Sequence, residues 1–518
     1  MKTQFYAKSE WDRCATANHL MLPSQVQRLE KKIVASRGLG TYVLMERAGH
    51  VLFSWFQHIE QQLQRAACRR LVIMAGSGNN GGDGYLLARL AIHKGYQVQV
   101  YAAKPPRPGV DAFLAYIKYL AVGGSIEPID EYQPNDKDYV VDALVGSGLQ
   151  GPLRESEALF VVKIDSARAL GCPVLAVDIP SGLEGENGST VGKCVEADYC
   201  LTFIAIKPGL LSGYGPNKTG QLYFAPLIGD NLAERQSIKD EQPIANRITF
   251  QAMAELIRQR PPVCHKGDFG HVVIIGGAQG MGGAAIMAAE AAMRSGCGWV
   301  SLITHKEHAT AMLTRCPEVM TLGLDDEGIP ASVGALLERA TAIVVGPGLG
   351  AGAWGKELSE LAFKYNKPMV IDADGLRYLP SRREEATLIT PHPGEAARLL
   401  CLSTEQIIAQ RFQSAKTLTQ QFNCITLLKG RGSTLVSPDG EVGVLDEGSP
   451  AMAVAGMGDV LAGLLGSLLA QGYDGWDAMR LGAALHGRAG EMAGECGVVG
   501  TRATELCHEI RLLMNSTI

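Results

Sequence analysis

LVIMAGSGNNGGDGYLLARLAIH, residues 71–93, sets the architecture of the first part of the chain. The first five residues are apolar and predict a short buried strand, and the glycine-rich segment that follows predicts a loop. The pattern from Tyr85 to His93 predicts a helix. A strand, a glycine-rich loop and a helix in this order are typical of a parallel α/β unit, in which the loop and the helix N-terminus meet a ligand.

Helices are also predicted before this stretch, and short apolar strands are predicted after it. Residues 24–68 predict helices, and further strands are expected at Val98–Ala102, Tyr139–Leu144 and Val174–Ile179, each followed by turn residues or a helix. Such strands, buried on both faces, predict a doubly wound, Rossmann-like parallel sheet with helices on both sides.

A second alternation of strands and helices follows a polar segment at residues 226–246. Because this segment has no sustained periodicity, we interpret it as a linker and predict domains at 1–235 and 236–518. A length of 518 residues suits two large α/β units. The second domain is predicted to be another parallel α/β sheet, with strands at His271–Ile275, Trp299–Ile303, Ala342–Val345, Pro368–Ile371 and Cys424–Leu428.

Composition narrows the class of function. The chain is 46% hydrophobic and 19% charged, which is typical of a globular protein. Its net charge of -5 is not the excess of basic residues that nucleic-acid-binding proteins carry. No apolar stretch approaches the roughly 20 residues that cross a bilayer. The 12 cysteines form no CxxC pair, which favours a reducing cytoplasm over a disulfide scaffold or a zinc site. His305 and His308 are expected on a solvated helix face rather than at a metal.

The glycine-rich loop carries the first candidate site. Gly76–Gly81 satisfies GxGxxG, which alone is a weak indication of dinucleotide binding. Asn79, Asn80 and Asp83 add amide and carboxylate oxygens to the backbone N–H donors, so these residues could bind a cation. For Asp83 a helix cap is an equally good interpretation.

Two carboxylates are expected where later strands end. Asp142 in VVDALVGSGLQGP and Asp178 in LAVDIPSGL would face the same crevice, although turn formation is the commoner role for one aspartate. Asp178 is the better acid–base group, because a buried carboxylate before Pro180 can gain a raised pKa and exchange a proton with substrate.

In the second half, Ala455-Gly456-Met457-Gly458-Asp459 precedes the helical run VLAGLLGSLLA. Its N–H groups would form an anion hole at a helix N-terminus, and Asp459 can take a proton from a hydroxyl that attacks a phosphate. Lys429–Ser433 offers phosphate donors or a charged hairpin turn, and His392–Glu395 offers a titratable pair or a simple helix start.

The blocks GNNGGDG, VDALVGSGLQGP and DIPSG together resemble the NAD(P)H-hydrate epimerase family, also called the YjeF N-terminal domain. The segment LMERAG at Leu44–Gly49 also resembles that family. The resemblance implies that Asn80, Asp142 and Ser181 hold potassium and that Asp178 lies at the reacting ring. It implies substrate contacts from Asn79, Asn80, Gly81, Gly82, Asp83, Gly146, Ser147, Gly148, Leu149, Gln150, Gly151 and Pro152.

The blocks HKGDFG, GPGLG, DADGL, PHPGE, KGRGS and GMGDVLAG resemble the ADP-dependent NAD(P)H-hydrate dehydratases, which have a ribokinase-like fold. The resemblance implies that Asp459 is the base, with substrate contacts from Gly348, His392, Pro393, Gly394 and Glu395. It implies ADP contacts from Lys429, Gly430, Arg431, Gly432, Ser433, Ser449, Ala455, Gly456, Met457 and Gly458. Ser449 stands where many relatives have asparagine.

Together the two resemblances imply a bifunctional enzyme that repairs hydrated NADH and NADPH. The R and S hydrates would be interconverted, and the S hydrate would be dehydrated with ADP, releasing AMP and phosphate. The expected small-molecule partners are these hydrates and ADP, with K⁺ and with Mg²⁺ accompanying ADP. A homo-oligomer is expected, with no nucleic-acid or membrane partner.

Three other interpretations were weighed. A hydride-transferring dehydrogenase needs an acidic residue about 20 positions after the glycines, and Gln97–Ala103 has none. A binding or regulatory module does not need both intact sets of acid–base aspartates and glycine loops. A ribokinase-like small-molecule kinase fused to a dinucleotide-binding domain explains Gly456–Asp459 equally well and stays open on chemistry alone.

Overall fold

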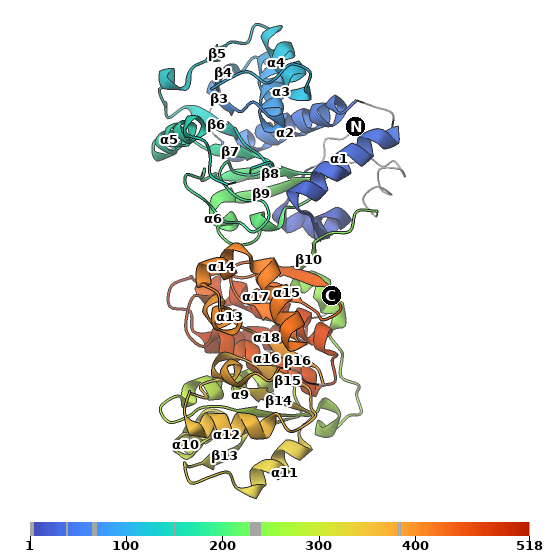
Figure 1. Ribbon diagram of the computed structural model, residues 1–518, viewed down its shortest axis with the longest axis vertical. Helices are drawn as coiled ribbons and strands as arrows, with labels where there is room; N and C mark the ends of the chain where they lie inside the picture. The colour runs from blue at the N-terminus through green and yellow to red at the C-terminus, as the bar shows by residue number, and fades with distance from the viewer. Residues whose placement is uncertain are drawn as a thin grey trace. The chain divides into compact units, whose positions relative to one another are not determined.

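The computed structural model describes residues 5–37, 40–64, 70–149, 151–227, 240–381, 383 and 385–516. The chain divides into two compact units, Met1–Asn246 and Arg247–Ile518, each built on its own sheet (Figure 1). The boundary predicted at 235/236 lies outside the described residues.

The first unit contains a largely parallel sheet in the order β1-β9-β8-β7-β6-β3-β4-β5. Only the short edge strand β1 runs antiparallel to its neighbour β9. Because the chain runs from β3 outward to β4 and β5 and then returns to β6, the order reverses between β3 and β6, where a doubly wound sheet opens its ligand crevice. The strands are β1 (Tyr6–Ala7), β3 (Arg70–Ala75), β4 (Gln97–Ala102), β5 (Ile126–Glu127), β6 (Asp138–Ala143), β7 (Val174–Val177), β8 (Tyr199–Phe203) and β9 (Gln221–Ala225).

Helices cover this sheet on both faces. Tyr139, Val141 and Ala143 of β6 belong to a core shared with α1 to α4, whereas α5 packs on β6 from the other face. The alternation along β6 follows from the strand's period of two. The helices are α1 (Pro23–Arg37), α2 (Tyr42–Gln62), α3 (Asn79–His93), α4 (Asp111–Leu120), α5 (Glu155–Ala169) and α6 (Gly215–Thr219).

The second unit contains strands in the order β13-β12-β11-β14-β15-β16-β17-β18-β19. The strands are parallel from β13 to β17, but β18 and β19 are antiparallel, so the expectation of a purely parallel sheet was wrong at this edge. The order reverses between β11 and β14. The strands are β11 (His271–Ile275), β12 (Trp299–His305), β13 (Met320–Leu324), β14 (Ala342–Val345), β15 (Met369–Ile371), β16 (Thr387–Ile389), β17 (Ile425–Leu428), β18 (Thr434–Val436) and β19 (Val442–Leu445).

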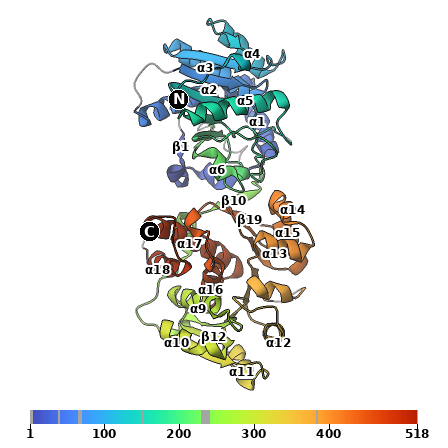
Figure 2. The same ribbon diagram turned by 90° about the vertical axis from the view of Figure 1, so that its left-hand side faces the viewer.

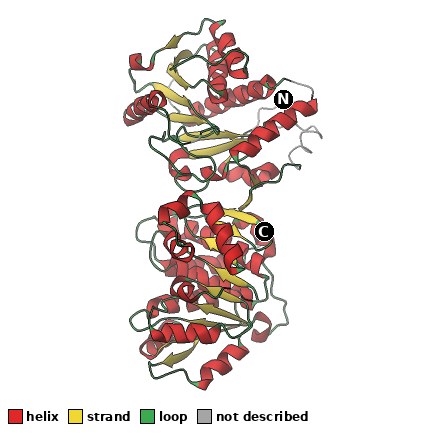
Figure 3. Ribbon diagram, in the orientation of Figure 1, coloured by secondary structure: helices red, strands yellow, loops and turns green. Residues whose placement is uncertain are grey.

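Helices again lie on both faces of the sheet (Figure 3). The apolar helix α16 packs against α9 and α17 in one large core, and α13, α14 and α15 form a separate group (Figure 2). The main helices are α9 (Gly282–Arg294), α10 (Ala309–Arg315), α11 (Ala331–Arg339), α12 (Ala353–Ala362), α13 (Pro393–Leu400), α14 (Thr404–Ala409), α15 (Arg411–Phe422), α16 (Met457–Ala470), α17 (Gly475–Gly494) and α18 (Leu506–Leu513).

The predicted α/β class is confirmed in both units. One local prediction was wrong, because α3 begins at Asn79 rather than at Tyr85, so most of the glycine-rich loop forms the first turns of the helix. Short strand β2 (His19–Leu20) pairs antiparallel with β10 (Ala245–Ile248) at Ala245 and Asn246. Among the described helices none combines the length and the apolar character needed to span a bilayer.

Candidate functional sites

A cavity of about 360 Å³ lies at the crevice of the first unit. Its walls come from the start of α3, the segment after β6, Asp178 after β7, and α1. The start of α3 can pack closely against the loop after β3 only because position 81 is glycine, since a Cβ there would lie 1.9 Å from the Gly76 carbonyl oxygen. The fold therefore brings together side chains from four separate parts of the sequence.

Asp142 and Ser181 form a fully buried pair beside this cavity. The Ser181 backbone N–H donates to Asp142 Oδ2 at 2.7 Å, and its hydroxyl donates to Asp142 Oδ1 at 2.6 Å. Burial raises the pKa of Asp142 to about 6, although the hydrogen bonds from Ser181 oppose the shift. No ion pair involves Asp142 within the described residues. Asn80, which lines the cavity, has a buried Nδ2 with no hydrogen-bond partner among these residues.

Asp178 forms an ion pair with Lys207, whose side chain is 1% exposed. The Lys207 ammonium group donates to Asp178 Oδ1, to the Thr202 hydroxyl at 3.1 Å and to the Phe203 carbonyl at 2.9 Å. Asp178 itself has a φ of +65°, an uncommon conformation for a non-glycine residue and one found at functional sites. The surrounding bonds hold the Asp178 carboxylate at the wall of the cavity.

Two further carboxyl groups line the same cavity. Burial raises the pKa of Glu30 on α1 to about 7, Lys207 opposes the shift and Asp178 adds to it. Burial also raises the pKa of Asp83 well above its usual range, helped by the charges of Asp178 and Glu30, and Asp83 Oδ1 has no hydrogen-bond partner among the described residues. Since the N-cap of α3 is Gly78, the interpretation of Asp83 as a helix cap was wrong.

The second unit gathers charged side chains where β15, β16 and β17 end. The Lys429 ammonium group donates to Asp372 Oδ1 at 2.8 Å and lies 3.9 Å from Glu395 Oε2. Burial acts to lower the pKa of Lys429, but the charges of Asp372 and Glu395 outweigh it and raise the pKa. Asp372 is 1% exposed and Glu395 is 7% exposed, whereas the Lys429 side chain is 23% exposed, so the two carboxylates are shielded from water more than the ammonium group is.

The N-terminus of α16 lies over this cluster. Its N-cap, Gly456, has a φ of +97°, which favours glycine, and a Cβ on Gly458 would lie 3.3 Å from both Asp372 Oδ2 and Lys429 Nζ. Burial raises the pKa of Asp459 to about 7, with a further increase from Asp372 and an opposing effect of Lys429. The site thus combines N–H groups at a helix N-terminus, a partly buried ammonium group and a carboxyl group that titrates near neutrality.

His392 is the N-cap of α13. Its Nδ1 accepts hydrogen bonds from the backbone of Gly394 at 3.0 Å and of Glu395 at 3.3 Å, and Glu395 Oε2 accepts from the His392 backbone N–H at 2.7 Å. The helix-start interpretation is therefore correct for the local structure. It also places Glu395 beside Lys429.

Residues 429–433 connect the antiparallel strands β17 and β18, so the hairpin interpretation is correct as well. The Arg431 guanidinium donates to the Gly448 carbonyl at 2.5 Å, which joins this hairpin to the segment that contains Ser449. The Ser449 hydroxyl accepts from the Ala451 backbone N–H at 3.2 Å and so caps a short 3₁₀ turn.

Gly348 follows β14 at the point where the strand order of the second sheet reverses. Its carbonyl accepts from the Ala278 backbone N–H at 2.7 Å, and the neighbouring Gly277 N–H donates to the Pro347 carbonyl at 2.9 Å. These bonds join residues 346–350 to the glycine-rich loop after β11.

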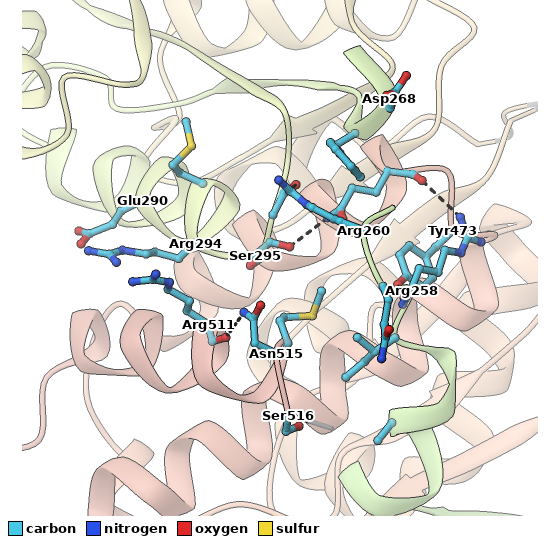
Figure 4. A pocket seen from close by; sticks show the side chains of 18 of the residues that line it. Arg258, Arg260, Asp268, Glu290, Arg294, Ser295, Tyr473, Arg511, Asn515 and Ser516 are labelled. Carbon is cyan, nitrogen blue, oxygen red and sulfur yellow. Dashed lines mark hydrogen bonds between the residues drawn. The ribbon is translucent and has the colours of Figure 1, made fainter. Parts of the chain in front are cut away.

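A larger cavity of about 1560 Å³ opens near the amino ends of β11 and β12 (Figure 4). None of the predicted site residues lines it. Arg260 donates to the carbonyl of Gly296, just after α9, and Arg258 donates at 3.3 Å to the carbonyl of Gly472, just after α16. Arg315 pairs with Glu290 at 2.8 Å. Arg258 and Arg260 thus bond to carbonyl groups at the C-terminal ends of helices, and Arg315 forms an ion pair. None of these contacts involves a residue of the two predicted sites.

Comparisons with known proteins bear on both sites. Residues 41–209 match the family described as YjeF-related protein N-terminus, and residues 272–512 match the family described as NAD(P)H-hydrate dehydratase. A bifunctional NAD(P)H-hydrate repair enzyme of Escherichia coli K12 is 39% identical over 501 residues, covering 95% of this chain and 93% of that protein. The chain belongs to the bifunctional NAD(P)H-hydrate repair enzymes.

Another repair enzyme, from Coxiella burnetii, is 37% identical and covers 95% of this chain and 98% of its own length. Among solved structures, the ADP/ATP-dependent NAD(P)H-hydrate dehydratase of Bacillus subtilis, co-crystallised with ATP/Mg²⁺, is 25% identical with a TM-score of 0.47. It covers 51% of this chain and 96% of that protein. The predicted membership of the repair-enzyme family is confirmed.

Within this repair enzyme, the structure places most of the predicted residues of the first site together. Seven of them line the cavity: Asn79, Asn80, Asp83, Gly146, Ser147, Gly148 and Asp178. Gly81 and Gly82 are buried in α3, whereas Leu149, Gly151 and Pro152 are not among its lining residues, and Gln150 lies outside the described residues.

Sequence reasoning missed three charged residues of the two sites. Glu30 lies in an ordinary amphipathic helix and Lys207 follows a strand that was not predicted, so neither carried a signal. Asp372 did carry one, because it directly follows the strand β15 in the block DADGL, just as Asp142 ends its own strand.

Proposed function

We propose that the chain repairs hydrated NADH and NADPH by two reactions, epimerisation of the R and S hydrates and ADP-dependent dehydration of the S hydrate. The observation that carries this proposal is that each unit has a carboxyl group suited to acid–base chemistry near the carboxyl ends of its parallel strands, within a repair-enzyme family to which nearly the whole chain belongs. The products of the second reaction are the dihydronicotinamide, AMP and phosphate.

In the first unit, epimerisation inverts the hydrated ring carbon. The ring nitrogen's lone pair can expel the hydroxyl as water when an acid protonates it, and water can return to the other face when a base removes its proton. Asp178, held by Lys207, and Glu30, whose pKa is about 7, line one cavity and supply these two roles. Asn79 to Asp83 and Gly146 to Pro152 are proposed to contact the substrate around them.

Asn80, Asp142 and Ser181 are proposed to hold a potassium ion. They offer carboxylate, hydroxyl and amide oxygens, which are hard donors that suit such a cation. Asp142 is 0% exposed and forms no ion pair among the described residues, and a buried carboxylate of this kind is stabilised by a bound cation. When bound, the ion would supply positive charge beside the loop that contacts the substrate.

In the second unit, Asp459 is proposed to take the proton of the ring hydroxyl while that oxygen attacks the terminal phosphorus of ADP. The N–H groups at the start of α16 and the Lys429 ammonium group stabilise the charge that develops on the phosphoryl oxygens. AMP leaves, and loss of phosphate together with a proton from the neighbouring ring carbon then restores the carbon–carbon double bond. Gly348 and His392 to Glu395 are proposed to contact the hydrate.

The nucleotide is proposed to lie against Lys429 to Ser433, Ser449 and Ala455 to Gly458, with Mg²⁺ accompanying its phosphates. The hydrogen bond between Arg431 and Gly448 supports this, because it brings the first two segments together. Cytoplasmic location is proposed from the thiols, since the eleven cysteines in the described part of the chain are all free.

A small-molecule kinase of the ribokinase type is the second candidate. The free N–H groups of α16 with Asp459 and Lys429 would serve phosphoryl transfer to other hydroxyls equally well. The two functions differ in their product, because a kinase leaves a stable phosphate ester and a dehydratase releases inorganic phosphate.

The test is a product balance. Purified protein is incubated with hydrated NADH and ADP, and AMP, phosphate and dihydronicotinamide are quantified by chromatography. Equal amounts of all three support dehydration, whereas a phosphorylated product without phosphate release supports the kinase. Replacing K⁺ by Li⁺ should slow epimerisation in the wild type but not in Asp142→Asn, if these residues hold the ion.

A further inference from the structure

A cluster of metal-ligand side chains lies outside both proposed sites, at the carboxyl end of β12. His305 Nδ1 lies 3.8 Å and His308 Nε2 lies 3.2 Å from the same Glu307 oxygen, Oε1. Within the described part of the chain, this is the only group of three or more His, Cys, Asp or Glu residues whose ligand atoms come within 4.8 Å of one another.

These separations suit a small divalent ion. A tetrahedral Zn²⁺ site with bonds of about 2.0–2.1 Å requires its ligand atoms to lie about 3.4 Å apart. The two measured separations, 3.2 and 3.8 Å, lie on either side of that value, so small side-chain rotations would complete the geometry. Two imidazoles and one carboxylate are also the ligand chemistry that Zn²⁺ accepts.

The environment of His305 points to a missing partner. His305 is the last residue of β12 and is 6% exposed, so the expected solvated helix face was wrong for this residue. Its Nδ1 is buried and has no hydrogen-bond partner among the described residues. Since buried polar atoms are nearly always satisfied, an atom that faces a carboxylate oxygen without bonding to it is explained by an ion between them.

The neighbouring glycine-rich loop orients the other two ligands. The Gly280 backbone N–H donates to Glu307 Oε1 at 2.7 Å, and the His308 ring lies directly over Gly282, where a Cβ would come within 2.3 Å of the imidazole. His308 Nε2 now contacts the Ala278 carbonyl at 3.1 Å. That carbonyl also accepts from the Met281 N–H at 2.8 Å, so it stays paired if His308 turns to a metal.

We propose that His305, Glu307 and His308 form a binding site for one divalent transition-metal ion, with Zn²⁺ as the best fit and a fourth position open to water. Glu307 is 36% exposed, which gives the ion access from solvent. The ion would join the end of β12 to the loop of residues 276–281, whose Ala278 N–H is bonded to Gly348. The inference does not depend on the proposed reactions.

The test is a metal titration of the full-length protein with Zn²⁺ against a chromophoric chelator, repeated with Co²⁺ as a spectroscopic probe. Wild type should bind one Zn²⁺ tightly, and its Co²⁺ form should show visible bands without a thiolate charge-transfer band. His305→Ala and His308→Ala should each weaken this site by about 100-fold or more, beyond the 10–100-fold typical of outer-shell changes. His265→Ala, at an exposed histidine outside the cluster, should bind as wild type does.

Glu307→Gln provides a variant whose altered side chain is partly exposed, so it tests the site even if a histidine variant fails to fold. It should weaken Zn²⁺ binding, and Zn²⁺ should raise the melting temperature of wild type but not of this variant. The proposal is overturned if wild type binds no Zn²⁺ at this stoichiometry, or if Glu307→Gln and His308→Ala bind it as tightly as wild type does.

Discussion

The two sites use a lysine in different ways. In the first unit Lys207 pairs directly with Asp178, the proposed acid–base group. In the second unit Lys429 pairs with Asp372, and the proposed base Asp459 is a neighbour whose pKa rises to about 7. Lys207 therefore fixes the position of the proposed acid–base group itself, whereas Lys429 fixes Asp372 and only opposes the rise that burial causes in the pKa of Asp459.

This contrast assigns the neutral-pH titration differently in the two units. In the first it belongs to Glu30, which lines the same cavity as Asp178 and Lys207, and in the second to Asp459 itself. In both units burial is the main cause of the raised pKa, and the nearby lysine opposes the shift.

Asp459→Asn should produce the largest effect. It removes the base but keeps the shape, so ADP-dependent dehydration should fall by about 10²–10⁴-fold, the range for general base catalysis. Epimerisation should be unchanged. The measurement is the initial rate of each reaction in the same preparation. Loss of both activities would contradict the proposal that the two sites act independently.

Asp178→Asn should lower epimerisation by about 100-fold or more and leave dehydration intact. Because it leaves the Lys207 ammonium group buried without its carboxylate, it should also lower the free energy of unfolding by about 3 kcal/mol. Adding Lys207→Met should restore most of that stability but none of the activity. A double variant that regains epimerisation would show that the pair is structural only.

Gly81→Ala tests the close approach in the first unit. The added Cβ would lie 1.9 Å from the Gly76 carbonyl oxygen, so α3 must shift away from the loop. Epimerisation should drop by about 10-fold or more, in line with the sensitivity of catalysis to misplacement by about 1 Å. Gly78→Ala is the matched control, because nothing lies within 4 Å of a Cβ at that position. Equal rates for the two variants would contradict the geometry.

The pH dependence of dehydration sharpens the role of Asp459. A base must be deprotonated, so kcat/KM should rise with pH and level off above the pKa of about 7. An Asp459 with an ordinary carboxyl pKa would give a flat profile across neutral pH. The profile is measured with saturating ADP.

Glu30→Gln should produce the smallest effect, about a 10-fold loss of epimerisation, because Asp178 and Lys207 stay in place. The wild-type rate should change near pH 7, where Glu30 titrates, and that change should disappear in the variant. A pH profile that keeps its inflection in Glu30→Gln would assign the proton transfer to another group.

The sequence predicted the parts of the fold that depend on local pattern. The apolar run before Gly76 predicted β3, and carboxylates at strand ends pointed to Asp142 and Asp178, because parallel strands bring their carboxyl ends together. It did not predict that α3 starts at Asn79, since the glycines that suggest a loop are required there by close packing, as at Gly81 against Gly76.

Residues supplied by distant elements were harder to find. Glu30 is one of several charged residues on α1, and only the folding of α1 against the crevice distinguishes it. Lys207 becomes significant only because it is buried beside Asp178. For His392 and Lys429 to Ser433, the structural interpretations from sequence were correct, yet the same residues also bring Glu395 and Lys429 together.

The most direct test of two independent sites follows dihydronicotinamide absorbance from a mixture of both hydrate epimers with ADP and K⁺. We predict that wild type converts the whole mixture. Asp178→Asn should stop after one epimer, and Asp459→Asn should lose almost all of the ADP-dependent signal while still interconverting the epimers. Complete conversion by Asp178→Asn, or ADP-dependent conversion by Asp459→Asn, at the wild-type rate would contradict the account.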